Sequence, residues 1–131
     1  PIIEEGGADI ILAFEELEAM RYLPYLKEDG TIIINSQQMM PMPVITGAAK
    51  YPYDALERIR EQCKNVIAVD ALSLAREAGS IKSANVVLLG VLAGLTQFNT
   101  TAWKDAIVSC VPKKTTEVNL KAFELGMGRR K

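Results

Sequence analysis

Five polar residues follow or end short apolar runs, which is where an α/β protein usually carries its chemistry. Glu15 and Glu16 come directly after the first run, Asn35 and Ser36 end the second, and Asp70 lies near the end of the third. Ligands of an open parallel sheet bind beyond the carboxyl ends of its strands, so these side chains are the first candidates for a site. Together they offer carboxylates, an amide and a hydroxyl.

The two glutamates argue against a nucleotide site after the first run. A dinucleotide-binding turn needs glycines between strand and helix, so that backbone N–H groups can approach the pyrophosphate. Glu15 and Glu16 occupy that position here, and their charge would repel a phosphate. Asp70 could bind a ribose, but a helix cap is the favoured role of an acid at a strand end. Asn35 and Ser36 either form a plain turn or face a neighbouring active site.

Histidine and cysteine content excludes several further kinds of site. The chain has no histidine, and its two cysteines, Cys63 and Cys110, lie outside any C-x-x-C pattern. Structural zinc and iron–sulfur sites need four ligands, and serine or cysteine nucleophiles usually need a histidine base. We expect both cysteines to be buried free thiols on apolar helix faces, in a reducing cytoplasm. The sequence predicts no metal site, no catalytic residue and no cofactor held by this chain alone.

The elements that would position these residues alternate between strand and helix. Continuous apolar runs predict strands buried on both faces at 8–14, 31–36 and 65–71, the second following a turn at Asp29-Gly30. Apolar residues at helical spacing predict helices at 15–26 (ended or kinked by Pro24), 53–63, 73–79, 83–95, 100–111 and 116–126 (capped by Gly126). Such alternation is typical of a three-layer α/β/α domain with a mainly parallel sheet, here a single domain over 1–131. Three strands are one or two fewer than such a domain normally has, so we expect part of it to be missing before residue 1.

A proline-rich stretch follows the second predicted strand. Residues 37–47 contain two prolines within three residues, which predicts an extended crossover loop or an edge strand rather than a helix. The same stretch carries Met39, Met40 and Met42, whose flexible side chains suit either core gaps or an adaptable contact surface. With Asn35 and Ser36, these methionines are the candidates to face a partner or a neighbouring active site.

The helix predicted over 83–95 is apolar all round and carries Gly90 and Gly94 four residues apart. Its apolar run is about half of the roughly twenty residues that a bilayer span needs, which argues against a membrane segment. The two glycines share one helix face and would allow close approach of another backbone, either within the domain or from a partner subunit. A formal net charge of −1 gives no global attraction to nucleic acid or to anionic lipid.

The succession of segments resembles a known family. "GGADIILAFEELEAMRYLPYLKEDGTIIINS", "PMPVITG", "VIAVDALSLAREAGSIKSANVVLLGVLAGL" and "VPKKTTEVNLKAFELG" are similar, in order and spacing, to the γ-type domain of 2-oxoacid:ferredoxin oxidoreductases. The indolepyruvate-type β subunits are the most similar members. In that family the domain usually starts with a strand, a G-x-G-G-Q-G turn and a helix, which this sequence lacks.

The resemblance implies a heteromeric cytoplasmic enzyme that oxidatively decarboxylates a 2-oxoacid to an acyl-CoA and passes electrons to ferredoxin. It implies that thiamine diphosphate, iron–sulfur clusters and coenzyme A are used by the complex, with a larger thiamine- and iron–sulfur-binding subunit as partner. This chain would then be mainly structural and inactive when isolated. The alternative is a free-standing α/β module that binds a nucleotide or an acyl-CoA.

Overall fold

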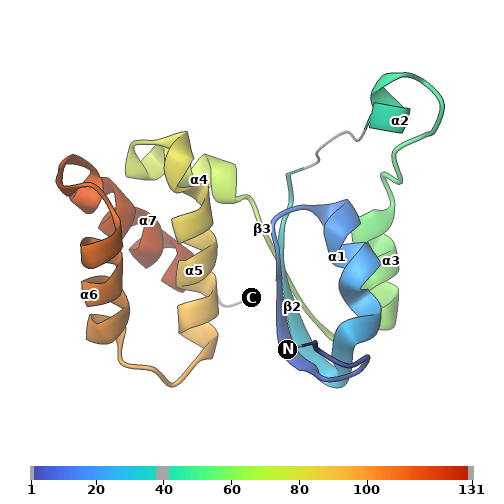
Figure 1. The fold of residues 1–131 in the computed structure, drawn as a ribbon, viewed down its shortest axis with the longest axis horizontal. Helices are drawn as coiled ribbons and strands as arrows, with labels where there is room; N and C mark the ends of the chain where they lie inside the picture. Colours follow the sequence, from blue (N-terminus) through green and yellow to red (C-terminus); the bar gives the residue numbers. More distant parts are fainter. Residues whose placement is uncertain (1, 38–41, 130–131) are drawn as a thin grey trace. The chain divides into compact units, whose positions relative to one another are not determined.

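The computed structural model describes residues 2–37 and 42–129. Contacts within the chain group it into two compact units, one up to residue 68 and one from residue 69 onward. The first unit holds the sheet and three helices, and the second is helical after the last strand residue (Figure 1). The predicted α/β fold with a mainly parallel sheet is confirmed.

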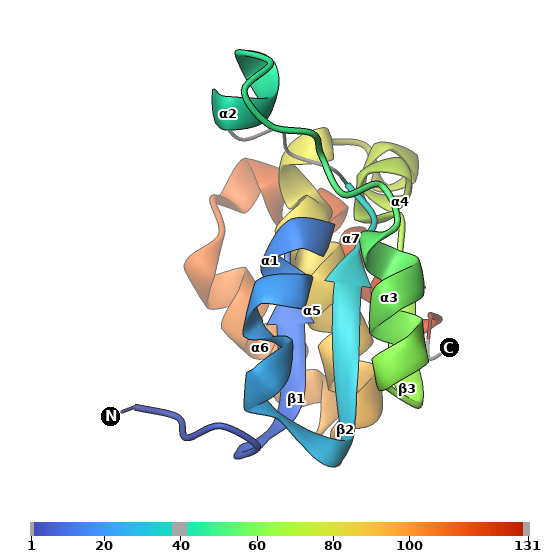
Figure 2. The same cartoon turned by 90° about the vertical axis from the view of Figure 1, so that its right-hand side faces the viewer.

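Three strands form the sheet in the order β1-β2-β3. They are β1 (Ala8–Ala13), β2 (Leu26–Asn35) and β3 (Asn65–Val69), and β1 pairs with β2 in parallel. The helices of this unit are α1 (Glu16–Tyr22), α2 (Met42–Ile45) and α3 (Ala55–Gln62), with a 3-10 turn at Leu23–Tyr25. Figures 1 and 2 show α1 and α3 on the same face of the sheet, where Ala19, Ile32, Ile34 and Ile59 form a buried core.

Two details of this unit differ from the prediction. β2 begins at Leu26 rather than at residue 31, and the predicted turn at Asp29-Gly30 is an irregularity inside the strand, where Ala8 pairs with Leu26 but Ile10 pairs with Thr31. The absence of a side chain on Gly30 permits this geometry, since a Cβ there would lie 2.6 Å from a methyl carbon of Leu26. The chain thus continues as a strand where its composition predicted a turn.

The prediction that the proline-rich stretch would not be helical was wrong for part of it. Met42–Ile45 forms the single helical turn α2, and Thr46 N–H donates to the carbonyl of Met42 at 2.9 Å. Pro43 lies in the first turn of the helix, where its missing N–H would have no helical acceptor in any case. Gly47 then leaves the turn with φ of +79°, a conformation that glycine adopts without strain.

The second unit is built from four helices with a buried apolar interior. They are α4 (Ala71–Ala78), α5 (Ala84–Leu95), α6 (Thr100–Cys110) and α7 (Thr116–Met127), with 3-10 turns at Ile81–Ser83 and Lys113–Thr115. Val87, Leu88 and Val91 of α5 and Phe123 of α7 are fully buried. None of the helices in the described ranges has the length and apolarity that a membrane crossing requires.

Glycines bring α5 and α7 into backbone contact. A Cβ on Gly90 would lie less than 3.0 Å from the carbonyl oxygen of Phe123, and one on Gly126 would lie equally close to the carbonyl oxygen of Val87. Gly126 was predicted to cap α7, but the helix continues to Met127 and Gly128 is its cap, so that prediction was wrong. Gly94, one turn beyond Gly90 on α5, is half-buried.

Candidate functional site

The carboxyl ends of β1 and β2 bring three of the predicted polar residues into a buried setting. Glu15 and Glu16 are each 5% exposed and Asn35 is 4% exposed. The Asn35 side-chain amide donates to the carbonyl of Phe14 at 3.2 Å, which ties the end of β2 to the end of β1. We call Glu15, Glu16, Asn35 and Tyr51 the carboxyl-end cluster.

Glu15 joins two segments through its two carboxylate oxygens. Its Oε2 accepts a hydrogen bond from the Glu18 N–H at 3.0 Å and so caps the start of α1. Its Oε1 accepts a hydrogen bond from the hydroxyl of Tyr51, which lies between α2 and α3. A buried carboxylate needs such partners, because an unsatisfied buried charge is costly. The geometry assigns Glu15 a positioning role at this end of the sheet.

Tyr51 was not predicted as a site residue. It is 4% exposed, and its ring lies 5.3 Å from that of Tyr53. Burial, followed by the hydrogen bond to Glu15 and the charges of Glu15 and Glu16, raises the pKa of Tyr51 well above its usual value. The hydroxyl therefore stays protonated and acts as a donor. The only signal in the sequence was an aromatic residue with a polar tip, between Lys50 and Pro52.

The remaining predicted residues of this region lie on the segment that leads away from β2. Ser36 is half-buried directly after the strand, whereas Met42 is 68% exposed on α2. Met39 and Met40 lie outside the described residues. Ile45 and Tyr53 are also largely exposed, at 65% and 68%. Figures 1 and 2 show α2 beyond the carboxyl ends of β1 and β2, and Tyr53, which follows on the same segment, packs its ring against that of Tyr51 in the cluster.

Asp70 serves as a helix cap, the role that was favoured for it. Its carboxylate accepts hydrogen bonds from the N–H and the hydroxyl of Ser73, at 3.0 and 2.6 Å, at the start of α4. These two bonds from Ser73 lower the pKa of Asp70 below its usual value. The geometry explains Asp70 without a ribose ligand.

Replacing Asp70 with alanine is expected to lower the free energy of unfolding by about 1 kcal/mol, the usual cost of losing a helix cap. Because the folded-state pKa of Asp70 is depressed, its contribution is present above the ordinary aspartate pKa and is lost as the pH falls through the folded-state value. Urea unfolding at neutral and acidic pH measures both effects. Asp70→Ser retains a capping oxygen and should recover most of the loss. Equal losses in the two variants would contradict the assignment.

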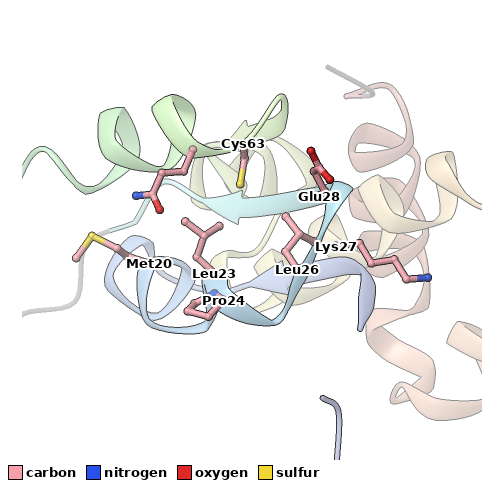
Figure 3. A pocket seen from close by; sticks show the side chains of 8 residues that line it. Met20, Leu23, Pro24, Leu26, Lys27, Glu28 and Cys63 are labelled. Atoms are coloured by element: carbon pink, nitrogen blue, oxygen red, sulfur yellow. The ribbon is translucent and has the colours of Figure 1, made fainter. Parts of the chain in front are cut away.

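The first unit also contains a pocket at the amino end of β2. It has a volume of about 270 Å³, and Figure 3 shows Leu23, Pro24, Leu26 and Cys63 on its walls. Burial raises the pKa of the Cys63 thiol, which keeps it protonated and weakly nucleophilic. Cys63 is half-buried, but Cys110 is exposed at the end of α6, so the prediction that both cysteines are buried was wrong for Cys110.

The hydrogen bonds of the carboxyl-end cluster position its side chains, because Asn35 joins β2 to Phe14 and Glu15 joins α1 to Tyr51. Within the described ranges, no three or more histidine, cysteine, aspartate or glutamate side chains gather as a metal site would require. Glu15 and Glu16 are both buried there, and their charges would disfavour a phosphate. The exposed apolar side chains of Met42, Ile45 and Tyr53, on the segment between β2 and α3, are typical of a contact surface.

Known proteins are similar to this sequence over almost its whole length. The sequence pattern of the pyruvate ferredoxin/flavodoxin oxidoreductase family matches residues 1–129. The chain belongs to this family. An indolepyruvate oxidoreductase subunit IorB from Thermococcus kodakarensis is 42% identical over 131 residues, covering 96% of this chain and 65% of the relative. The corresponding subunit of Pyrococcus horikoshii has the same identity and the same coverage.

Solved structures of the oxidoreductase family share the fold. The γ subunit of a keto/oxoacid ferredoxin oxidoreductase from Geobacter sulfurreducens superimposes with a TM-score of 0.71 at 24% identity, covering 98% of this chain and 64% of that one. The chain therefore spans about 65% of the length of the curated relatives that it matches. The predicted resemblance to the γ-type domain of this family is confirmed.

Proposed function

We propose that this chain is a non-catalytic subunit, or part of one, in a thiamine diphosphate-dependent 2-oxoacid:ferredoxin oxidoreductase of the indolepyruvate type. The observation that carries the proposal is the 42% identity to an indolepyruvate oxidoreductase subunit over 96% of the chain. The complex would oxidatively decarboxylate a 2-oxoacid to carbon dioxide and an acyl-CoA in the cytoplasm, with ferredoxin as electron acceptor.

The chemistry of this chain supports an accessory role. It has no histidine and two cysteines, one half-buried in the first unit and one exposed in the second. An iron–sulfur cluster would need four cysteine ligands. A thiamine diphosphate would need a glycine-rich turn for its diphosphate, or carboxylates that bind the metal ion beside it. These residues fit neither group. We therefore assign thiamine diphosphate, the clusters and coenzyme A to other parts of the complex, on a larger subunit.

We further propose that the segment around α2 contacts that larger subunit. Three exposed apolar side chains lie on the segment between β2 and α3, and one of them, Tyr53, packs against Tyr51 of the carboxyl-end cluster; the three are Met42, Ile45 and Tyr53. Asn35 and Ser36 lie at its start, at the end of the sheet where ligands of α/β proteins bind. In this arrangement the carboxyl ends of the strands, in the single three-layer domain predicted for the chain, would face the partner's active site.

Co-expression with the larger thiamine- and cluster-binding subunit tests the proposal. The two chains are expected to co-elute and to reduce ferredoxin in an indolepyruvate-dependent reaction, whereas this chain alone is expected to be inactive. If both chains are obtained folded and pure but do not co-elute, the proposal is overturned. Tight binding of a nucleotide or of acyl-CoA to this chain alone, measured by calorimetry, would favour the free-standing module instead.

The contact segment has its own variant. Met42→Asp combined with Ile45→Asp is expected to weaken association with the larger subunit at least tenfold, because buried apolar anchors dominate interface energies. Val108→Asp is the matched control, since Val108 is 47% exposed on α6 of the second unit. Binding of labelled chain measured by anisotropy gives both affinities. Equal losses of affinity in the two variants would show that the α2 segment is not part of the interface.

A further inference from the structure

A cavity of about 430 Å³ lies within the second unit, at the beginnings of α5 and α7. Figure 1 shows both helices starting at the same end of this unit. The walls combine cationic, polar and aliphatic side chains: Ser80, Lys82, Ser83, Asn85, Val86, Val111, Pro112, Lys114, Thr115, Val118 and Asn119. The function proposed above makes no use of this cavity.

The charge of the cavity is uniformly positive. Lys82 and Lys114 line it, and no aspartate or glutamate is among the described residues of its walls. Neither lysine forms an ion pair within the described ranges, although Lys27, Lys64 and Lys104 each do. In a chain with a net charge of −1, two unpaired lysines on one cavity form a local attraction for an anion.

α5 and α7 begin at this cavity, each directly after a 3-10 turn. The Ala84 N–H donates to the Ile81 carbonyl and the Thr116 N–H donates to the Lys113 carbonyl. Because Glu117 also lies in the first turn of α7, an anion would be held by the two lysines and not by free helix N–H groups. The Ser83 hydroxyl donates to the carbonyl of Ser80 at 2.7 Å, and the Thr115 hydroxyl donates to that of Pro112 at 2.9 Å. Both hydroxyls are therefore engaged within the chain, like the N–H groups at the helix starts.

The cavity also has an apolar wall, formed by the aliphatic side chains of Val86, Val111 and Val118. A bare inorganic anion would leave this wall in contact with water, whereas an apolar group joined to the anion would cover it. The volume is within the range of small-ligand pockets.

We propose that this cavity binds a phosphate ester that carries a small apolar group, with Lys82 and Lys114 holding the phosphate. The valine side chains contact the apolar group. The site lies wholly in the second unit and is separate from the carboxyl-end cluster, where buried glutamates disfavour a phosphate.

Phenyl phosphate is a suitable probe, titrated into the chain at constant ionic strength and followed by amide chemical shifts. Saturable shifts are expected for residues on the cavity walls. Lys82→Gln and Lys114→Gln are each expected to raise the dissociation constant about fivefold, and more at low salt, because the interaction is electrostatic and partly screened. Lys121→Gln removes the same charge from an exposed position of α7 that does not line the cavity, and should change nothing.

Two comparisons make the test decisive. Inorganic phosphate should bind at least fivefold more weakly than phenyl phosphate, and phenol should not bind, because each lacks one half of the ligand. Absence of saturable shifts would overturn the proposal, as would equal losses in Lys121→Gln and the two cavity variants. Equal binding of phosphate and phenyl phosphate would overturn the role of the valine wall. None of these outcomes depends on the larger subunit, so a failure here is distinguishable from a failure of the proposed function.

Discussion

Replacing Gly90 or Gly126 with alanine is expected to lower the free energy of unfolding by about 3 kcal/mol, at the upper end of the usual cost of overpacking. The added methyl group would meet a backbone carbonyl of the facing helix, from Phe123 in one case and from Val87 in the other. A backbone cannot move aside as a flexible side chain can. The two helices would have to separate, and the packing of buried residues such as Val87 and Phe123 would be lost.

The sign of this effect distinguishes packing from helix propensity. On propensity alone, alanine should stabilise a helix by about 1 kcal/mol relative to glycine. Gly128→Ala is the matched control, because a Cβ there would be at ordinary contact distance, 3.5 Å from the nearest atom, with φ of −70°. Urea unfolding of the three variants gives the comparison. A neutral or stabilising Gly90→Ala would contradict the close approach of α5 and α7.

The second large effect concerns the buried pair of Tyr51 and Glu15. Tyr51→Phe is expected to lower the free energy of unfolding by about 2 kcal/mol at neutral pH, because the buried carboxylate of Glu15 loses a donor. The phenylalanine ring retains the packing against Tyr53, so the loss reports the hydroxyl rather than the ring. Thermal or urea unfolding measures it.

The pair also predicts a dependence on pH. The pKa of Tyr51 is raised in the folded chain above the ordinary value of 10.0, so its stabilising contribution is complete below that value and is lost as the pH rises. Above pH 10 the unfolded chain releases the proton first, and the free energy of unfolding should fall by up to about 1.4 kcal/mol per pH unit. Tyr51→Phe should show a shallower decline, and Tyr22→Phe, at an exposed tyrosine, should decline like the parent chain. Identical slopes in all three proteins would rule out a buried, protonated Tyr51.

Most of the fold was predictable because its elements are regular and periodic. The apolar runs and helical spacings predicted nine elements, and eight of them lie within four residues of their observed bounds, whereas β2 begins five residues before its predicted start. The errors fell where a single position overrides the pattern. Gly30 allows β2 to continue through an apparent turn, Pro43 is tolerated in a first helical turn, and Gly126 packs against α5 instead of ending α7.

The candidate site was predicted less completely, for a physical reason. Glu15, Glu16 and Asn35 follow from the rule that chemistry lies at the carboxyl ends of parallel strands. Tyr51 lies 36 positions from Glu15, and nothing local in the sequence shows that the two side chains meet. The lysine-lined cavity could not be predicted for the same reason: residues 80–86 and 111–119 become neighbours only after α5 and α7 pack together.

The Glu15 carboxylate accepts hydrogen bonds from both the Glu18 N–H and the Tyr51 hydroxyl. These two bonds would affect how tightly the chain binds the larger subunit proposed as its partner. The exposed side chains of the α2 segment belong to a stretch that is fastened at Tyr51 to the first turn of a helix. A surface held in place before association loses little conformational entropy when a partner covers it. Breaking that fastening should therefore weaken association through a lower probability of the competent conformation, even though Tyr51 is itself too buried to touch a partner.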